Sequence, residues 1–304
     1  MGGTSWSSDS YSRIASSHST KSKDDIFTST SLASDMSPKG VKFREARDSD
    51  AHPESLAINV FLDETGSMGD IPYILVKEKL GALMETIMKH GIPHPAVLFG
   101  GIGDHHSDRS PLQVGQFESG TEELNLWLTK IFLEANGGGQ DMESYLLAWL
   151  FAARHTSIDC FEKRGVKGFL FTIGDERSWD SVDGESLKNL MGYSASEGIT
   201  DAEILAEAQR TYHVFHIHVN CTGYKDNKTV IGYWRKMLGE RCIVLEDYNA
   251  LAEVIASTVA VMHGVDLKSI TANFDKNTAK LVSGALANIT SVTTTSKKDG
   301  VVKL

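Results

Sequence analysis

Three oxygen-bearing side chains, Asp63, Thr65 and Ser67, occupy alternate positions in the segment INVFLDETGSMGD, residues 58–70. They directly follow an apolar run at residues 58–62 that reads as a buried strand. A carboxylate and two hydroxyls in one tight turn can offer several oxygens to one small, hard cation. We therefore expect a divalent-cation site at the end of this strand.

Further acidic loops follow other predicted strands. Asp175 ends the run GVKGFLFTIGDE, Asp104 lies in GGIGDHH, and the loop NGGGQDMES opens a helix near Asp141. In an open parallel sheet, ligands bind beyond the carboxyl ends of the strands. If the strands that end at Asp63 and Asp175 are neighbours, these loops meet at one site. Hydroxyls with one or two carboxylates suit Mg²⁺, with Mn²⁺ or Ca²⁺ as the other candidates.

Strand and helix patterns alternate from residue 56 to residue 263. Apolar runs predict strands at 56–62, 96–104, 165–176, 212–219 and 242–248, and the alternating segment 111–117 predicts an edge strand paired with the second of these. Periodic apolar residues predict helices at 80–88, 122–134, 141–156 and from 247 onward. This alternation indicates an α/β fold, a doubly wound and mostly parallel six-stranded sheet with helices on both faces.

The segment FLDETGSMGD resembles the metal-ion-dependent adhesion site (MIDAS) of von Willebrand factor A domains, whose pattern after the first strand is Asp-x-Ser-x-Ser. Thr65 offers the hydroxyl of the family's middle Ser. The family's last ligand is an Asp at the end of the fourth strand, where this chain has Asp175. The resemblance covers residues 54–263, and IGDHHSDRSPLQVGQFES is more similar to intracellular prokaryotic members than to adhesion receptors.

This resemblance implies the sheet order 3-2-1-4-5-6, with the third strand antiparallel at the edge. That order makes the strands ending at Asp63 and Asp175 neighbours. The chain departs from the family at Gln140, which by register stands where the family usually has Thr, with Asp141 next. Gln140 is either a carbonyl ligand or a backbone hydrogen bonder. The implied metal ligands are Asp63, Thr65, Ser67 and Asp175, with Gln140 as a further candidate.

Other polar residues near these loops have structural interpretations. We expect Asp104 to be a turn or second-shell residue, Asp141 to lie nearby, and Glu143 to be an acidic charge at a helix N-terminus. His105 and His106 read as solvated loop residues. A second pair, His216 and His218, shares one face of a buried strand and reads as satisfied core histidines.

The two ends of the chain and its composition also lead to predictions. Residues 1–50 are Ser-rich and read as a flexible tail, and removal of residues 1–40 should leave the domain folded. The alternative is an arm ordered on a partner or on the domain surface. Residues 264–304 form a tail or a strap. The chain of 304 residues has a net charge of −10 and three scattered cysteines, and it has no transmembrane or signal pattern. We expect a cytoplasmic protein that binds neither nucleic acid nor membrane.

Three functions follow from these features. The first is a non-enzymatic module that binds a partner's carboxylate through an open Mg²⁺ position; the resemblance makes a MoxR-type AAA+ ATPase the leading partner class. The second is a haloacid-dehalogenase-like phosphatase with Asp63 as nucleophile, because GDERSWD (174–180) fits its late motif, although Thr65 stands where those enzymes usually have Asp. The third is a structural subunit with a vestigial metal site.

Overall fold

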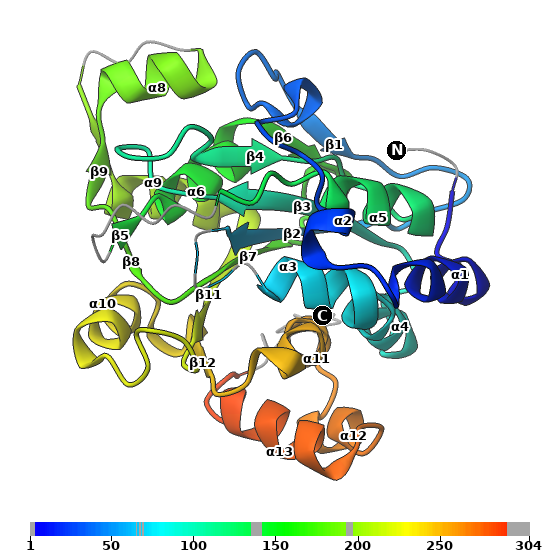
Figure 1. Cartoon of the computed structure of the whole chain (residues 1–304). Helices are drawn as coiled ribbons and strands as arrows, with labels where there is room; N and C mark the ends of the chain where they lie inside the picture. The colour runs from blue at the N-terminus through cyan, green and yellow to red at the C-terminus, as the bar shows by residue number, and fades with distance from the viewer. Residues whose placement is uncertain are drawn as a thin grey trace, which may run out of the picture.

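A mixed six-stranded sheet forms the centre of the computed structural model, which describes residues 4–64, 66, 68, 70–134, 142–192 and 197–290 (Figure 1). The strands lie in the order β4-β3-β2-β7-β11-β12. All neighbours are parallel except β3 and β4, which are antiparallel at one edge. This confirms the predicted α/β class. The six strands are β2 (Leu56–Asp63), β3 (Pro95–Ile102), β4 (Leu112–Val114), β7 (Gly168–Gly174), β11 (Tyr212–Val219) and β12 (Cys242–Leu245).

Three pairs of short strands lie outside this sheet and were not expected. They are β1 (Arg44–Ala46) with β6 (Thr156–Ile158), β5 (Met142–Glu143) with β8 (Arg177–Ser178), and β9 (Ser181–Val182) with β10 (Ile199–Thr200). The pair β5–β8 is parallel and joins the loop that follows β7 to the loop that precedes α6. It therefore ties together two of the loops that carry predicted site residues.

Helices cover both faces of the sheet. Successive residues of a strand point to opposite faces. Phe169 of β7 lies on one face, 5.6 Å from the ring of His263 at the end of α11. His216 of β11 lies on the other face, 5.0 Å from the ring of Tyr145 in α6. The helix α4 packs with α11, and α6 packs with α9.

The helices have the following bounds: α1 (Ser8–His18), α2 (Lys23–Ile26), α3 (Asp70–Ile74), α4 (Leu80–Lys89), α5 (Thr121–Thr129), α6 (Tyr145–Arg154), α7 (Asp159–Glu162), α8 (Gly184–Met191), α9 (Asp201–Thr211), α10 (Lys228–Leu238), α11 (Leu251–Met262), α12 (Leu267–Thr271) and α13 (Lys276–Ala285). Short helical turns are η1 (Ser34–Met36), η2 (Leu75–Lys79), η3 (Gly239–Arg241) and η4 (Tyr248–Ala250).

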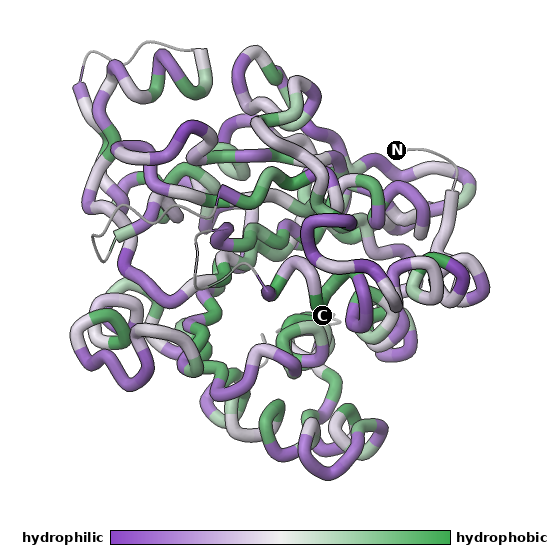
Figure 2. The backbone as a smooth tube through the Cα atoms, viewed as in Figure 1, coloured by the Kyte–Doolittle hydropathy of each residue, from purple (hydrophilic) through white to green (hydrophobic). Residues whose placement is uncertain are grey.

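The core lies between the sheet and these helix layers. Every residue of β2, β3 and β7 is buried, which explains why these strands read as continuous apolar runs. The apolar colouring of Figure 2 is correspondingly concentrated on the central strands. The helix α6 is also buried nearly all round, so its sequence shows little amphipathic period. No described helix has the length and apolar character needed to span a bilayer.

Residues 4–50 form an ordered arm, which corrects the expectation of a flexible tail. Figure 1 shows this N-terminal arm, in blue, running along the domain from α1 through α2 to β1. Its side chains Ile26, Phe27 and Met36 are buried in the core. The ring of Tyr11 lies against the backbone of Gly81, where a Cβ atom would collide with it. The alternative of an arm ordered on the domain surface is therefore the one that the structure has.

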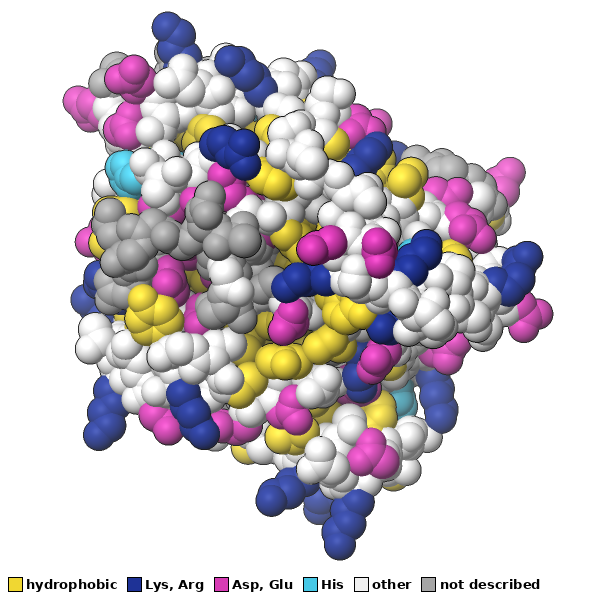
Figure 3. Space-filling view, viewed as in Figure 1, with side chains coloured by type: hydrophobic (Ala, Val, Ile, Leu, Met, Phe, Trp, Pro, Cys, Tyr) yellow, Lys and Arg dark blue, Asp and Glu magenta, His cyan; other side chains and the backbone are white. Residues whose placement is uncertain are grey.

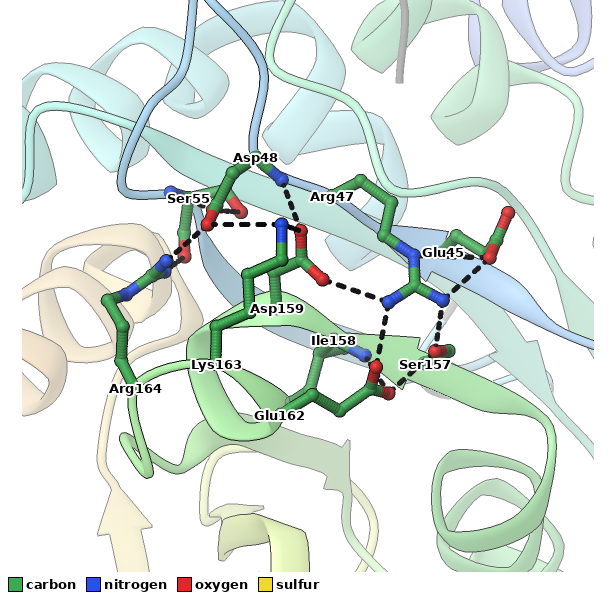
Figure 4. Close-up of polar contacts among 10 residues, drawn as sticks. All are labelled: Glu45, Arg47, Asp48, Ser55, Ser157, Ile158, Asp159, Glu162, Lys163 and Arg164. Carbon is green, nitrogen blue, oxygen red and sulfur yellow. Dashed lines mark hydrogen bonds and ion pairs between the residues drawn. The ribbon is translucent and has the colours of Figure 1, made fainter.

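An ion-pair clasp, made by Arg47 and Asp48 of the arm with Asp159, Glu162, Lys163 and Arg164, fastens the arm at the amino ends of β2 and β7 (Figure 4). Arg47 Nη1 lies 2.9 Å from Asp159 Oδ1 and 2.8 Å from Glu162 Oε2. Arg164 Nη1 lies 2.5 Å from Asp48 Oδ2, and its other terminal nitrogen donates to the carbonyl oxygen of Ser55, 2.5 Å away. The clasp thus joins two segments that are far apart in the chain, residues 47–55 and 159–164.

The C-terminal segment is a strap as far as residue 290. The helices α12 and α13 pack on α11, and Ile270, Val282 and Leu286 are buried beneath them. Thr290 Oγ1 donates to Glu240 Oε1 at 2.9 Å. Residues 291–304 lie outside the described part of the chain.

Candidate metal centre

The two predicted carboxylate ligands lie side by side at the carboxyl ends of β2 and β7. Leu62 pairs with Ile173, so Asp63 lies next to Gly174, and Asp175 follows one residue later. Both carboxylates are buried, with 1% and 0% of their surface exposed. Only glycine fits at 174, because a Cβ atom there would collide with Tyr145 Oη and lie 2.9 Å from Asp63 Oδ2.

A hydroxyl group holds each of these carboxylates. Tyr145 Oη donates to Asp63 Oδ2 at 2.8 Å, and Thr222 Oγ1 donates to Asp175 Oδ2 at 2.6 Å. Hydrogen bonds of this kind orient ligating carboxylates in metal sites. The sequence reasoning missed both residues. Tyr145 is a polar ring at the start of an otherwise apolar helix, which is the only signal that could have indicated it.

Glu143 adds a third buried acid, and its environment is strongly anionic. Burial, followed by repulsion from Asp63 and Glu176, raises the pKa of Glu143 to about 11. Its Oε2 is buried with no hydrogen-bond partner among the described residues. Burial also raises the pKa of the Tyr145 phenol, and Asp63, Asp175 and Glu143 raise it further. We call Asp63, Glu143, Asp175 and Glu176 the carboxylate cluster.

The donor set of the carboxylate cluster fits a hard cation. It consists of oxygens, as Mg²⁺ and Ca²⁺ prefer, without thiolates. Within the described ranges, no three His, Cys, Asp or Glu side chains are close enough to hold a metal ion by themselves. Asp63 and Asp175 therefore need further oxygens. The predicted ligands Thr65, Ser67 and Gln140 lie outside the described residues, as does Asp141, which was expected nearby.

Asp104 lies at the same end of the sheet and acts as a turn residue. Its Oδ1 accepts from Trp179 Nε1 at 2.8 Å and from the backbone N–H of His106 at 3.0 Å. Its Oδ2 accepts from Ser107 Oγ at 2.9 Å. With both oxygens used in this way, Asp104 fits the turn interpretation and fixes the indole of Trp179.

Glu64 is a buried acid that the sequence reasoning did not single out. It follows Asp63 directly and is 1% exposed. Burial raises its pKa well above the ordinary value, although a hydrogen bond from Gln113 lowers it in part. Its only signal in the sequence was a second acid at the end of an apolar strand.

The histidines differ in part from expectation. His216 is buried and stacks on Trp234 with 3.5 Å between ring centroids, and Nδ1 lies 3.0 Å from Thr172 Oγ1, as a core histidine should. His218 is equally buried, but neither of its ring nitrogens has a hydrogen-bond partner in the described part of the chain. His105 is half-buried rather than solvated, and burial lowers its pKa to about 4.

Comparisons with known proteins found solved structures of low sequence identity and low TM-score. No family model matches the chain, and no curated protein matches it. The pilus adhesin SpaC from Lactobacillus rhamnosus GG, in its open conformation, aligns with a TM-score of 0.45 and 9% identity, over 71% of this chain and 31% of that chain. Proximal thread matrix protein 1 from the mussel byssus aligns with a TM-score of 0.44 and 9% identity, over 72% of this chain and 48% of that chain.

A further structure of this mussel protein, with a zinc-occupied MIDAS motif, aligns with a TM-score of 0.41 and 12% identity, over 68% of this chain and 46% of that chain. The chain thus spans about a third to a half of the length of these proteins. At TM-scores this low, we draw no argument from these alignments, and the proposals below rest on the residues of this chain.

Proposed function

We propose that the chain is a protein-binding module that depends on a divalent cation. The observation that carries this proposal is the side-by-side placement of Asp63 and Asp175 at the carboxyl ends of neighbouring parallel strands, inside a buried cluster of acids. Asp63 and Asp175 would hold the cation, together with Thr65, Ser67 and Gln140 as the sequence predicts. The cation would supply positive charge and one coordination position for a carboxylate of the partner.

The residues of this chain would prepare that position. Tyr145 and Thr222 hold the two carboxylates in place through their hydroxyl groups. The acids at this site would repel an acidic partner, so the cation must reverse the local sign of charge before the partner binds. Mg²⁺ is our first candidate, with Mn²⁺ and Ca²⁺ as alternatives.

Binding explains the site better than catalysis does. A haloacid-dehalogenase-like phosphatase usually has a second Asp two residues after its nucleophile as general acid, whereas this chain has Thr65 two residues after Asp63. We therefore propose that the protein is not an enzyme. A phosphatase screen with Mg²⁺ tests this point, because turnover abolished by Asp63→Asn would replace the binding proposal with the haloacid-dehalogenase-like one.

Calorimetry with Mg²⁺ and Mn²⁺ tests the metal site. Wild-type protein should bind one cation, and Asp63→Asn and Asp175→Asn should remove measurable binding while both variants keep a cooperative melt. Cation binding should also raise the melting temperature, because a ligand that binds only the folded state stabilises it. An unchanged melting temperature with Mg²⁺ would instead favour the structural subunit with a vestigial site.

The identity of the partner is the finer part of the proposal. From the sequence resemblance alone, we propose a cytoplasmic protein of the intracellular prokaryotic type whose partner is a MoxR-type AAA+ ATPase, and not nucleic acid or membrane. The described side chains on the face in Figure 3 fit the last point, since basic residues there are scattered among acidic ones. Co-purification from the native host with and without chelator tests it, and a partner that stays bound in chelator would contradict the metal-dependent mode.

A further inference from the structure

A groove runs along the outer edge of β12. This strand lies at one edge of the central sheet, and in the described part of the chain only β11 pairs with it. The helices α10 and α13 both contact β12 and flank it (Figure 1). Two cavities of about 440 and 380 Å³ lie along the strand, and Arg235 and Val244 line both of them. The two cavities therefore adjoin, and together we call them the edge groove.

The backbone of Val244 faces the edge groove. The N–H of Asn220 donates to the carbonyl oxygen of Leu245 at 2.8 Å, so the backbone groups of Leu245 point toward β11. Successive residues of a strand direct their backbone groups to alternate sides, so those of Val244 point away from β11. On that side Val244 has no backbone hydrogen bond within the described residues. An unpaired edge of this kind is a template for a further strand.

Two glycines keep the edge groove open. Gly232 of α10 lines one of its cavities, and Gly284 of α13 lines the other. A Cβ atom on either residue would meet no heavy atom within 4 Å. Glycine is unfavourable inside a helix, so these two positions leave space beside β12 although they weaken their helices.

The described part of the chain ends beside the amino end of this groove. Asn288 and Glu240 line the groove, and Thr290 Oγ1 donates to Glu240 Oε1 at 2.9 Å. Glu240 lies two residues before the start of β12. The segment that follows Thr290 therefore starts next to the amino end of β12, and an extended course along the groove from there would be parallel to β12.

The sequence after Thr290 has the residue types and the length to pair with β12. Residues 292–295 are Val, Thr, Thr and Thr, and such β-branched residues favour strands. β12 itself has four residues. Four extended residues beside it would cover the same length, roughly 10 Å at the rise of a parallel strand.

The charges agree with this direction. Lys297 and Lys298 follow the β-branched residues, and a parallel course would bring them to the carboxyl end of β12. Asp226 and Glu246 line the groove there, and neither acid forms an ion pair among the described residues. The groove also has basic residues on its α10 side, so these contacts add to the backbone pairing and do not replace it.

We propose that residues 291–298, which lie outside the described part of the chain, add to the outer edge of β12 as a parallel strand and fill the edge groove. The central sheet then has seven strands, and the C-terminal strap continues over its open edge. An uncovered edge strand pairs readily with other chains, so this contact keeps β12 from doing so. It does not involve the proposed metal centre.

Hydrogen exchange of the Val244 amide in the full chain tests the proposal. Thr293→Pro combined with Thr294→Pro removes two backbone donors and is incompatible with a paired strand. This pair should speed exchange at Val244 about 10-fold or more. Asp299→Pro combined with Gly300→Pro is the matched control beyond the proposed strand, and it should leave the exchange rate unchanged.

Trypsin cleavage after Lys297 gives a second, independent measurement on the segment itself. Gly284→Trp fills the edge groove from α13, where a larger side chain meets no neighbour, and it should displace the segment. Cleavage measured by mass spectrometry should then be about 10-fold faster than in wild type. Gly284→Ala is the matched control, because a methyl group leaves the groove open, and its cleavage should match wild type.

Three results would each overturn the proposal. They are equal Val244 exchange in wild type and the first proline pair, equal acceleration by both proline pairs, and Val244 protection that rises with protein concentration. The last result would make a second copy of the chain the occupant of the groove. Each variant is checked for a cooperative melt, and if the first proline pair does not fold, the Gly284 variants still decide. Asp63→Asn should leave Val244 exchange unchanged, so this proposal and the metal site can fail separately.

Discussion

Buried acids lie near both ends of strands β2 and β7, but the pKa of the acid at one end is lowered and the pKa of the acid at the other end is raised. At the amino ends, burial works to raise the pKa of Asp159, yet hydrogen bonds from Lys163, Asp48 and Arg47 hold it at about 2. At the carboxyl ends, burial and neighbouring acids together raise the pKa of Glu143 to about 11. The same class of residue is therefore ionised in one place and protonated in the other.

The difference lies in the origin of the compensating charge. The clasp brings its own cations, since Arg47, Lys163 and Arg164 lie within ion-pair distance of its acids. For Glu143, the largest influences after burial are other carboxylates. A buried charge is stable only when it is paired or coordinated. The clasp thus pairs its acids within the chain, whereas we propose that a cation from solution compensates the acids around Glu143.

Removing the arm should have the largest effect. Deletion of residues 1–50 removes the clasp and uncovers the surfaces under Ile26, Phe27 and Met36. Each of these buried side chains is worth about 1.5–3 kcal/mol, so we expect a loss of several kcal/mol, or no cooperative unfolding at all. Urea denaturation followed by circular dichroism measures this. An unchanged midpoint would restore the original expectation that the segment is dispensable.

Matched substitutions near the amino and carboxyl ends of β2 and β7 should change the free energy of unfolding differently when a chelator is present. Asp159→Asn should lower the free energy of unfolding by about 1–3 kcal/mol, because charged hydrogen bonds are lost. Asp63→Asn should leave it unchanged or raise it, because repulsion within the carboxylate cluster falls. Urea titrations of both variants measure this, and equal losses would show that the two ends do not differ. The Asp159→Asn loss should shrink as pH falls from about 4 toward 2.

The pH dependence of Glu143 should be opposite to that of Asp159. The folded state keeps the Glu143 proton up to about pH 11, while the unfolded chain loses it above the ordinary value near 4.5. The stability contribution of Glu143 is therefore fully present below pH 4.5 and is lost as pH rises. In chelator, Glu143→Gln should match wild type at pH 4 and exceed it by about 1 kcal/mol or more at pH 8. A pH-independent difference in urea midpoints would contradict this.

The smallest effect should come from Glu45, an exposed acid that pairs with Arg47 at the edge of the clasp. Glu45 Oε1 lies 2.8 Å from Arg47 Nη2, but its side chain is 52% exposed. Exposed ion pairs contribute about 0–1 kcal/mol. Glu45→Gln should therefore change the free energy of unfolding by less than Asp159→Asn does. A larger loss at Glu45 than at Asp159 would show that burial does not determine which ion pair of Arg47 contributes more to stability.

The central sheet was predictable because its strands leave a strong local signal. The buried runs at 56–63 and 168–174 are continuous and mostly apolar, and the proposed ligands Asp63 and Asp175 follow from where those runs stop. The arm was not predictable in the same way. Ile26, Phe27 and Met36 enter the core one at a time, so the arm shows no apolar period despite being anchored.

Contacts between distant residues explain the rest of what the sequence did not reveal. Tyr145 and Thr222 act on Asp63 and Asp175 through single hydroxyl groups that lie 82 and 47 residues away in the chain. Nothing in the local pattern marks such hydroxyls as site residues. The family resemblance predicted which loop residues bind the metal, and the structure adds the hydroxyl groups that hold the two carboxylates in place.

The clasp also has a consequence for the order of events during synthesis. Asp48 leaves the ribosome 116 residues before its partner Arg164. At about 5–20 residues per second, the first segment must wait roughly 6 to 23 s before its docking surface exists. A Ser-rich chain with few apolar side chains can wait in water without aggregating. The composition that made residues 1–50 look like a tail is therefore what a late-docking arm requires.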